Sequence, residues 1–90
     1  MIYITEVHME GGAYGGHEHI HSVQWRNPSS GETGQSSRST MVDWINDGGD
    51  ARVTDGTREV RVGVVDADPP CIRTYADGAY TDNLLALPRY

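Results

Sequence analysis

Alternation of apolar and polar residues predicts that most of this chain forms β-strands. β-Branched and aromatic side chains fill residues 2–9, and the pattern predicts a second strand over residues 17–26. Between them, residues 10–16 contain four glycines, whose backbone freedom opposes regular structure. The two strands are therefore expected to form a long hairpin.

The middle of the chain has the pattern of a second hairpin. A short strand over residues 51–54 leads through Asp55-Gly56, a type I′ turn signal, into a strand over residues 59–66. Alternation in that strand predicts one inward face, formed by Val60, Val62 and Val64.

A second Asp-Gly turn predicts a further hairpin near the C-terminal end. Residues 71–75 are expected to pair with Tyr80-Thr81 across Asp77-Gly78. Residues 82–87 then predict one helical turn, which Pro88 ends because the residue before a proline avoids helical geometry.

One short helix is predicted over residues 40–47. The Thr40 hydroxyl is expected to cap its first amides, with Asp43 completing an approximate capping box. Gly48 or Gly49 is expected to end it. The apolar stripe expected to pack on the sheet is formed by Met41, Trp44 and Ile45.

Together these elements predict a single small domain over residues 1–90, mainly β (α+β). The expected architecture is a five-stranded, mostly antiparallel sheet with one short helix and a C-terminal helical turn. Residues 27–39, rich in Ser, Gly and Asn, predict a polar connection. A chain of this size buries roughly 60% of its unfolded surface, so we expect a thin core and no deep pocket.

Composition narrows the classes of partner and compartment. The formal net charge is −6, with seven arginines and no lysine, which disfavours nucleic acid because phosphate binding needs clustered cations. The single cysteine, Cys71, predicts no internal disulfide and is expected to be a small buried residue. Neither a signal peptide nor a membrane-spanning apolar run is indicated. We therefore expect a soluble, cytoplasmic protein.

The histidines are the sharpest candidates for metal chemistry. His17, His19 and His21 alternate along the predicted second strand, so neighbouring imidazoles on one face lie roughly 6.6–6.8 Å apart along its axis. His17 and His19 would converge on one zinc ion, with His8 on the paired strand offering a third ligand. The alternative is that the histidines form the polar, half-exposed end of a hairpin and bind no cofactor.

The C-terminal hairpin carries the candidate binding surface. Tyrosine and arginine anchor many protein interfaces because they join a large contact area to directional hydrogen bonds. The candidate residues are Arg73, Tyr75, Tyr80, Asp82 and Asn83. The side chains expected to hold this hairpin against the core are Ile72, Leu84, Leu85 and Leu87. The alternative is that the five polar residues serve only local hairpin and cap geometry.

Several sequence blocks carry a family resemblance. They are Gly16-His17-Glu18-His19-Ile20, Val23-x-Trp25, Met41-Val42-x-Trp44-Ile45, Arg73-Thr74-x-Ala76-Asp77-Gly78 and the Asp82-Asn83-Leu84-Leu85 end. In these blocks the chain resembles domain-of-unknown-function family 3892, a group of short bacterial and phage proteins. The resemblance implies a small, mostly antiparallel sheet with limited helix, and it supplies no activity.

Three hypotheses of function follow. No nucleophile–base set and no phosphate loop stands out, so we expect a protein that is not an enzyme. The leading hypothesis is a noncatalytic module that binds another protein. The alternatives are a metal-binding protein built on the His-x-His strand, and a single-stranded nucleic-acid binder that stacks bases on its aromatic residues.

Overall fold

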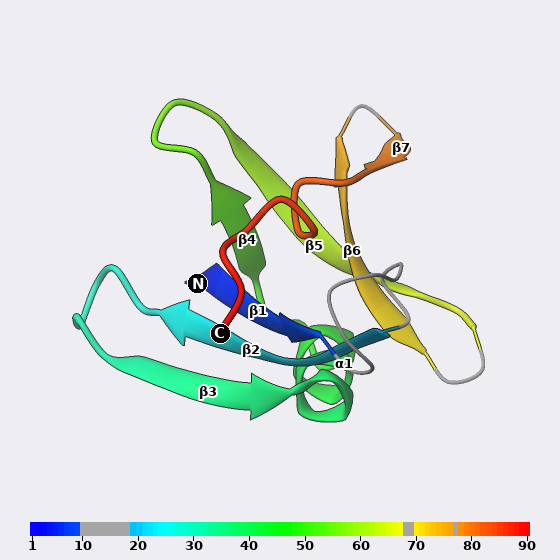
Figure 1. The fold of residues 1–90 in the computed structure, drawn as a ribbon, viewed down its shortest axis with the longest axis horizontal. Coiled ribbons are helices and arrows are strands. Elements are labelled where there is room, and N and C mark those ends of the chain that lie inside the picture. The colour runs from blue at the N-terminus through cyan, green and yellow to red at the C-terminus, as the bar shows by residue number, and fades with distance from the viewer. Residues whose placement is uncertain (10–18, 68–69, 77) are drawn as a thin grey trace.

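The computed structural model describes residues 1–9, 19–67, 70–76 and 78–90, which form one sheet and one helix (Figure 1). In chain order the elements are β1 (Ile2–Met9), β2 (Ile20–Arg26), β3 (Thr33–Ser37), α1 (Arg38–Asn46), β4 (Ala51–Thr54), β5 (Glu59–Val65), β6 (Cys71–Ala76) and β7 (Ala79–Thr81). The mainly β class with one helix is thereby confirmed.

The sheet has seven strands in the order β3-β2-β1-β4-β5-β6-β7 within the described residues. Neighbours are antiparallel except β1 and β4, which run parallel through Ile2↔Ala51 and Tyr3↔Arg52. The prediction of five mostly antiparallel strands is therefore wrong, since the sheet has seven strands and is mixed. The parallel pair joins strands separated by β2, β3 and α1, which no local pattern reveals.

The polar connection predicted over residues 27–39 contains β3, which the sequence analysis missed. β3 pairs with β2 from Ser22↔Ser37 to Arg26↔Thr33. It lies at the edge of the sheet (Figure 1), and its residues are exposed or half-buried. A strand with so little burial has no apolar alternation, which is why its sequence resembles a loop.

The hairpin of β1 and β2 contains two β-bulges. The register passes from Ile4↔Trp25 to Glu6↔Gln24 and from His8↔Ser22 to Met9↔Ile20. One extra residue therefore stands in each strand, Thr5 in β1 and His21 in β2. The second bulge is the reason that Ile20 and Val23 both point into the core although they are three residues apart.

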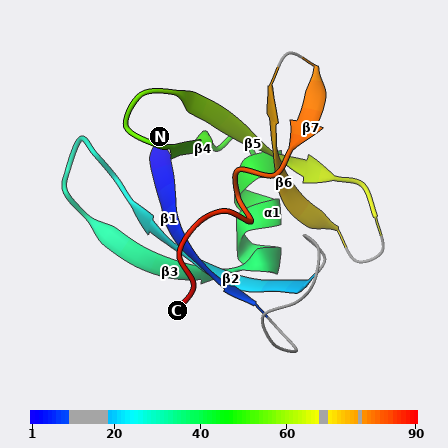
Figure 2. The same ribbon diagram turned by 45° about the horizontal axis from the view of Figure 1, so that its top comes forward.

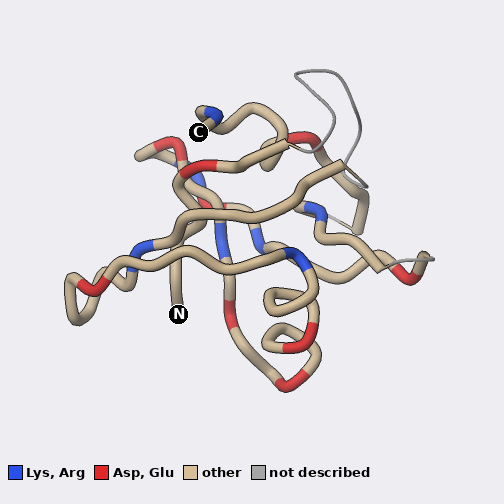
Figure 3. Tube along the Cα trace, turned by 60° about the horizontal axis from the view of Figure 1, so that its bottom comes forward, with Lys and Arg blue, Asp and Glu red and all other residues tan. Residues whose placement is uncertain are grey.

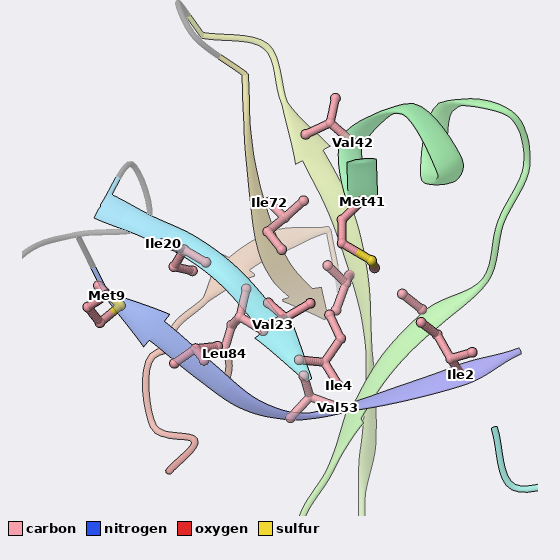
Figure 4. Packing of buried hydrophobic residues seen from close by; sticks show 13 residues of the cluster. Ile2, Ile4, Met9, Ile20, Val23, Met41, Val42, Val53, Ile72 and Leu84 are labelled. Atoms are coloured by element: carbon pink, nitrogen blue, oxygen red, sulfur yellow. The ribbon is translucent and has the colours of Figure 1, made fainter. Parts of the chain in front are cut away.

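The last described residues return to β1. The Val7 amide donates to the Pro88 carbonyl at 3.0 Å, and the Tyr90 amide donates to the Val7 carbonyl at 3.2 Å. Between β7 and this return, residues 82–87 form consecutive hydrogen-bonded turns, and the Ala86 amide donates to the Asp82 carbonyl at 3.3 Å, as in the single helical turn predicted. The path carries Leu84 into the core beside Val23 (Figure 4), where its side chain is fully buried.

The helix packs on the sheet through two of the three predicted residues and through Val42. The helix α1 lies against the sheet (Figure 2). Its residues Met41 and Val42 are buried in the core cluster (Figure 4), and Ile45 packs against it. Trp44 remains 37% exposed, so the prediction that Trp44 anchors the helix is wrong. Instead its indole lies over Gly49, where an added Cβ would collide with the ring.

Both ends of α1 have side-chain or glycine caps. The Ser37 hydroxyl accepts a hydrogen bond from the Thr40 amide at 3.2 Å, so Ser37 and not Thr40 is the N-cap. At the other end, Gly48 has φ +99°, as predicted for the C-terminal cap. The Gly48 and Gly49 amides donate to the Ile45 and Trp44 carbonyls, which completes a Schellman motif. No helix among the described residues is long and apolar enough to cross a bilayer.

The turn between β4 and β5 is longer than the type I′ turn predicted. Thr54 pairs with Glu59, so the loop contains four residues. The Asp55 carboxylate accepts hydrogen bonds from the Thr57 and Arg58 amides, both at 2.8 Å. These bonds lower the pKa of Asp55 because they stabilise its charged form.

A charged network on the outside of the sheet ties β1 to β4 and β5. Arg52 of β4 pairs with Asp50 and with Glu59, each at 2.9 Å, and the Tyr3 hydroxyl donates to Glu59. The hydrogen bond from Arg52 lowers the pKa of Asp50, and those from Tyr3 and Arg52 lower the pKa of Glu59. The same contact with Glu59 raises the pKa of Tyr3.

This network predicts an acid-sensitive part of the stability. Because the folded-state pKa values of Asp50 and Glu59 lie below their unfolded values of roughly 3.9 and 4.3, their contribution is present above those values and is lost as the pH falls through the lowered ones. The free energy of unfolding should therefore decrease between about pH 5 and pH 2. Urea unfolding of Arg52→Met should show a shallower decrease than the wild type.

Arg61→Met is the matched control for this experiment. Arg61 is the register partner of Arg52, and it forms no ion pair within the part of the chain that the structure describes. Its removal should leave most of the acid-dependent slope in place. Equal slopes for the wild type and Arg52→Met would contradict the assignment.

Candidate functional site

Two tyrosines form the centre of the surface predicted on the C-terminal hairpin. Tyr75 of β6 and Tyr80 of β7 are register partners, and their rings meet edge to face with centroids 6.4 Å apart. Both stay accessible, with Tyr75 38% and Tyr80 53% exposed. The predicted pairing across the turn is therefore confirmed, and it leaves aromatic surface open to solvent.

Arg73 is fixed beside this tyrosine pair. Its guanidinium carbon lies 5.5 Å from the Tyr80 ring centroid, and its Nη2 contacts the Asp82 carboxylate at 2.9 Å. Its Nε also donates to the Thr81 carbonyl at 3.3 Å. The structure thus brings together four of the five predicted binding residues, and we call Arg73, Tyr75, Tyr80 and Asp82 the hairpin face.

A glycine from the neighbouring strand completes the surface. Gly63 of β5 pairs with Arg73, and a Cβ added at Gly63 would stand 2.7 Å from Cε1 of Tyr75. The Tyr75 ring therefore lies close over Gly63, at a position where only a glycine leaves room. A shallow hollow of about 440 Å³ opens here, lined by Gly63, Val64, Tyr75, Gly78, Ala79 and Tyr80. In the sequence, Gly63 interrupts the run of valines in β5, and this glycine could have indicated that another side chain packs closely against the strand there.

The hairpin face stands on a buried base. Ile72 and Leu84 are fully buried, and Leu85 and Leu87 pack against the core, as predicted. Thr74 is also fully buried: its hydroxyl donates to the Thr81 carbonyl at 3.1 Å and accepts from the Thr81 hydroxyl at 2.8 Å. Cys71 is buried, as expected.

Asn83 lies apart from the hairpin face. It lines a separate cavity of about 690 Å³ between the β4–β5 turn and the turns after β7, together with Arg58, Thr81 and Leu87. Asp82 and Asn83 are adjacent in sequence but serve different surfaces, which their sequence positions do not reveal.

The histidine hypothesis is tested only in part by the geometry. His17 lies outside the described residues, and His19 precedes β2 in an exposed position. The bulge in β2 sets the rings of His8 and His21 edge to face, with centroids 5.7 Å apart, and Nδ1 of His8 contacts the Tyr90 carbonyl oxygen. No group of three metal-ligating side chains occurs among the described residues. Zinc binding by His17, His19 and His8 stays a prediction.

Charged residues are interspersed over the molecule. Figure 3 shows acidic and basic positions distributed among the strands, the helix and the loops. Most of the paired charges belong to the network of Arg52 and to the hairpin face.

Comparison with known proteins gives one family. The model of a family described as "Protein of unknown function (DUF3892)" matches residues 3–88. No curated protein and no solved structure matches the chain.

Proposed function

The chain belongs to this family of proteins of unknown function, and we propose that it is a noncatalytic module that binds another protein through its hairpin face. The single observation that carries the proposal is a pair of exposed tyrosines whose rings are already fixed in the free protein. Tyr75 is held over Gly63, and Tyr80 is held between Tyr75 and Arg73.

Fixed aromatic side chains favour binding for an energetic reason. Ordering a mobile side chain at an interface costs roughly 0.5–1.5 kcal/mol, and a side chain that is already ordered avoids much of this cost. Tyrosine adds contact area and a hydroxyl that can bond to a partner. The guanidinium of Arg73 is partly neutralised by Asp82, so the face suits a protein surface of mixed polarity better than a polyanion.

We also propose a compartment and an origin for the protein. The single cysteine fits a protein that acts in the reducing cytoplasm, and a bacterial or phage origin is what the family resemblance implies. Single-stranded nucleic acid is the competing ligand, because tyrosine rings also stack on bases. The net charge of −6 weighs against it.

The test is affinity capture from the native host with quantitative mass spectrometry. Arg73→Glu combined with Tyr80→Ala should lower recovery of the partner by more than about tenfold, since anchor residues of this type each contribute roughly 2 kcal/mol or more. Gly63→Ala should weaken capture independently, because it displaces the Tyr75 ring without touching the core.

Arg26→Glu is the matched control. Arg26 also lies over a tyrosine ring, 5.6 Å from the Tyr3 centroid, but on β2 and away from the hairpin. It should leave capture unchanged. If the doubly substituted protein keeps its circular dichroism spectrum and still recovers every partner of the wild type, the hairpin face is structural only. Salt-sensitive binding of an oligonucleotide that the double substitution removes would assign the face to nucleic acid instead.

A further inference from the structure

A groove between α1 and the sheet lies apart from the hairpin face. It has a volume of about 260 Å³ and is lined by Trp25 of β2 and Trp44 of α1, with the buried side chains of Ile2 and Met41 beneath them. Glu32, from the turn between β2 and β3, also lines it. Residues from four parts of the chain meet here, so the sequence alone did not reveal it.

The two indoles are held in place without any ligand. Trp25 lies over Gly34, its register partner in β3, where an added Cβ would collide with the ring. Its Nε1 donates to the Ser36 hydroxyl at 3.1 Å. Trp44 lies over Gly49 in the same manner and is 37% exposed. An exposed aromatic ring fixed in this way is prepared for contact with a ligand.

Glu32 gives the groove its charge. Its backbone is engaged, because the amide donates to the Ser30 hydroxyl at 3.2 Å and the carbonyl accepts from the Asn27 amide at 2.7 Å. Its carboxylate forms no ion pair or hydrogen bond within the described ranges. Two indoles beside a carboxylate favour a cation on an apolar stem, since the stem covers the rings while the charge meets both the π faces and the carboxylate.

The edge of the sheet beside this groove is open to strand addition. β3 is the terminal strand of the sheet and continues directly into α1 (Figure 1). Residues 33–37 contain no charged residue and no proline, the features that usually protect an edge from pairing. Alternate amides and carbonyls of β3 point away from β2 and are suited to hydrogen bonding with another strand.

We propose that the groove and the free edge of β3 form a second binding site, which takes an extended peptide that pairs with β3 and places a lysine side chain between Trp25 and Trp44, toward Glu32. The net charge of −6 and the free carboxylate supply the charge complementarity. The site shares no residue with the hairpin face, so its test is independent of the test of the proposed function.

Intrinsic fluorescence tests the site directly, because both tryptophans of the chain line the groove. The probe is an acetylated and amidated Thr-Val-Lys-Val-Thr peptide. It should give a saturable change in emission and shift the amide resonances of β3. The same peptide with norleucine at its centre should bind about tenfold more weakly, the loss expected for one charge-assisted contact.

Two variants of the protein separate charge from shape. Glu32→Gln should remove the preference for lysine over norleucine, and Trp44→Ala should weaken both peptides. Glu32 is exposed, so this variant tests the charge without endangering the fold. Arg73→Glu combined with Tyr80→Ala should leave peptide binding unchanged, because these residues lie on the hairpin face.

Two further probes test strand pairing. A peptide N-methylated at the amides that would face β3 should not bind, whereas n-butylammonium alone should bind far more weakly than the peptide. Equal binding of the lysine and norleucine peptides, or of the peptide and n-butylammonium, would overturn the proposal. So would a concentration-dependent dimer that blocks the groove, because it would assign the edge to a second copy of the chain.

Discussion

Leu84→Ala is expected to lower the free energy of unfolding by about 2–5 kcal/mol, enough to leave so small a domain marginally folded. The reason is its position: Leu84 comes from the turns after β7, yet it is fully buried in the main core cluster. Its removal leaves a cavity that the surrounding strands can fill only in part. Chemical denaturation followed by circular dichroism measures the change.

Trp44→Ala provides the comparison that makes this prediction specific. Trp44 is the larger side chain, and a sequence-based view would rank it first. Because it is 37% exposed and rests on Gly49, its loss removes less buried surface and creates no closed cavity. We therefore expect the smaller destabilisation for Trp44→Ala. The opposite order would contradict the packing described for α1.

The sequence correctly predicted those elements whose formation depends on residues close together in the chain. The valine alternation of β5, the hairpin across Asp77-Gly78 and the glycine at the end of α1 depend on residues close in sequence, and all were found. Of the predicted helix stripe, Met41 and Ile45 pack in or against the core, whereas Trp44 lies over Gly49 and Val42 is buried as well. Helical periodicity indicates that one face is buried but leaves the exact face to tertiary packing.

Pairing between segments distant in sequence accounts for the other differences between the predicted and the observed sheet. The parallel pair of β1 and β4 and the return of the tail to Val7 join distant segments through backbone hydrogen bonds, which carry no side-chain signature. The edge strand β3 was missed for a related reason, because its exposed residues need no apolar pattern. The number of strands and their order in the sheet therefore could not be predicted from local sequence patterns.

For the candidate sites too, residues brought together by local structure were predicted, and residues brought together by long-range packing were not. Arg73, Tyr75, Tyr80 and Asp82 were predicted together because one hairpin places them side by side. Gly63 was missed, since its role depends on the strand that pairs with β6. The groove of Trp25, Trp44 and Glu32 was missed altogether, because only the packing of α1 on the sheet brings these residues together.

Thr74→Val is expected to destabilise the protein by about 1–3 kcal/mol, although valine has nearly the same shape as threonine. The fully buried hydroxyl of Thr74 exchanges hydrogen bonds with the register partner Thr81, and valine would leave the Thr81 hydroxyl and carbonyl without them. Thr74→Ser keeps the hydroxyl and should cost less than valine does.

A double-mutant cycle with Thr81→Val isolates the coupling of the two hydroxyls. We expect an interaction energy of roughly 0.5–3 kcal/mol, as for other residues that share one hydrogen-bond network. Hydrogen exchange should also quicken in β6 and β7, because this pair joins the strands that carry Tyr75 and Tyr80. Additive effects of the two substitutions, with unchanged exchange in β7, would show that the hairpin face is ordered by its surface contacts and not by its buried base.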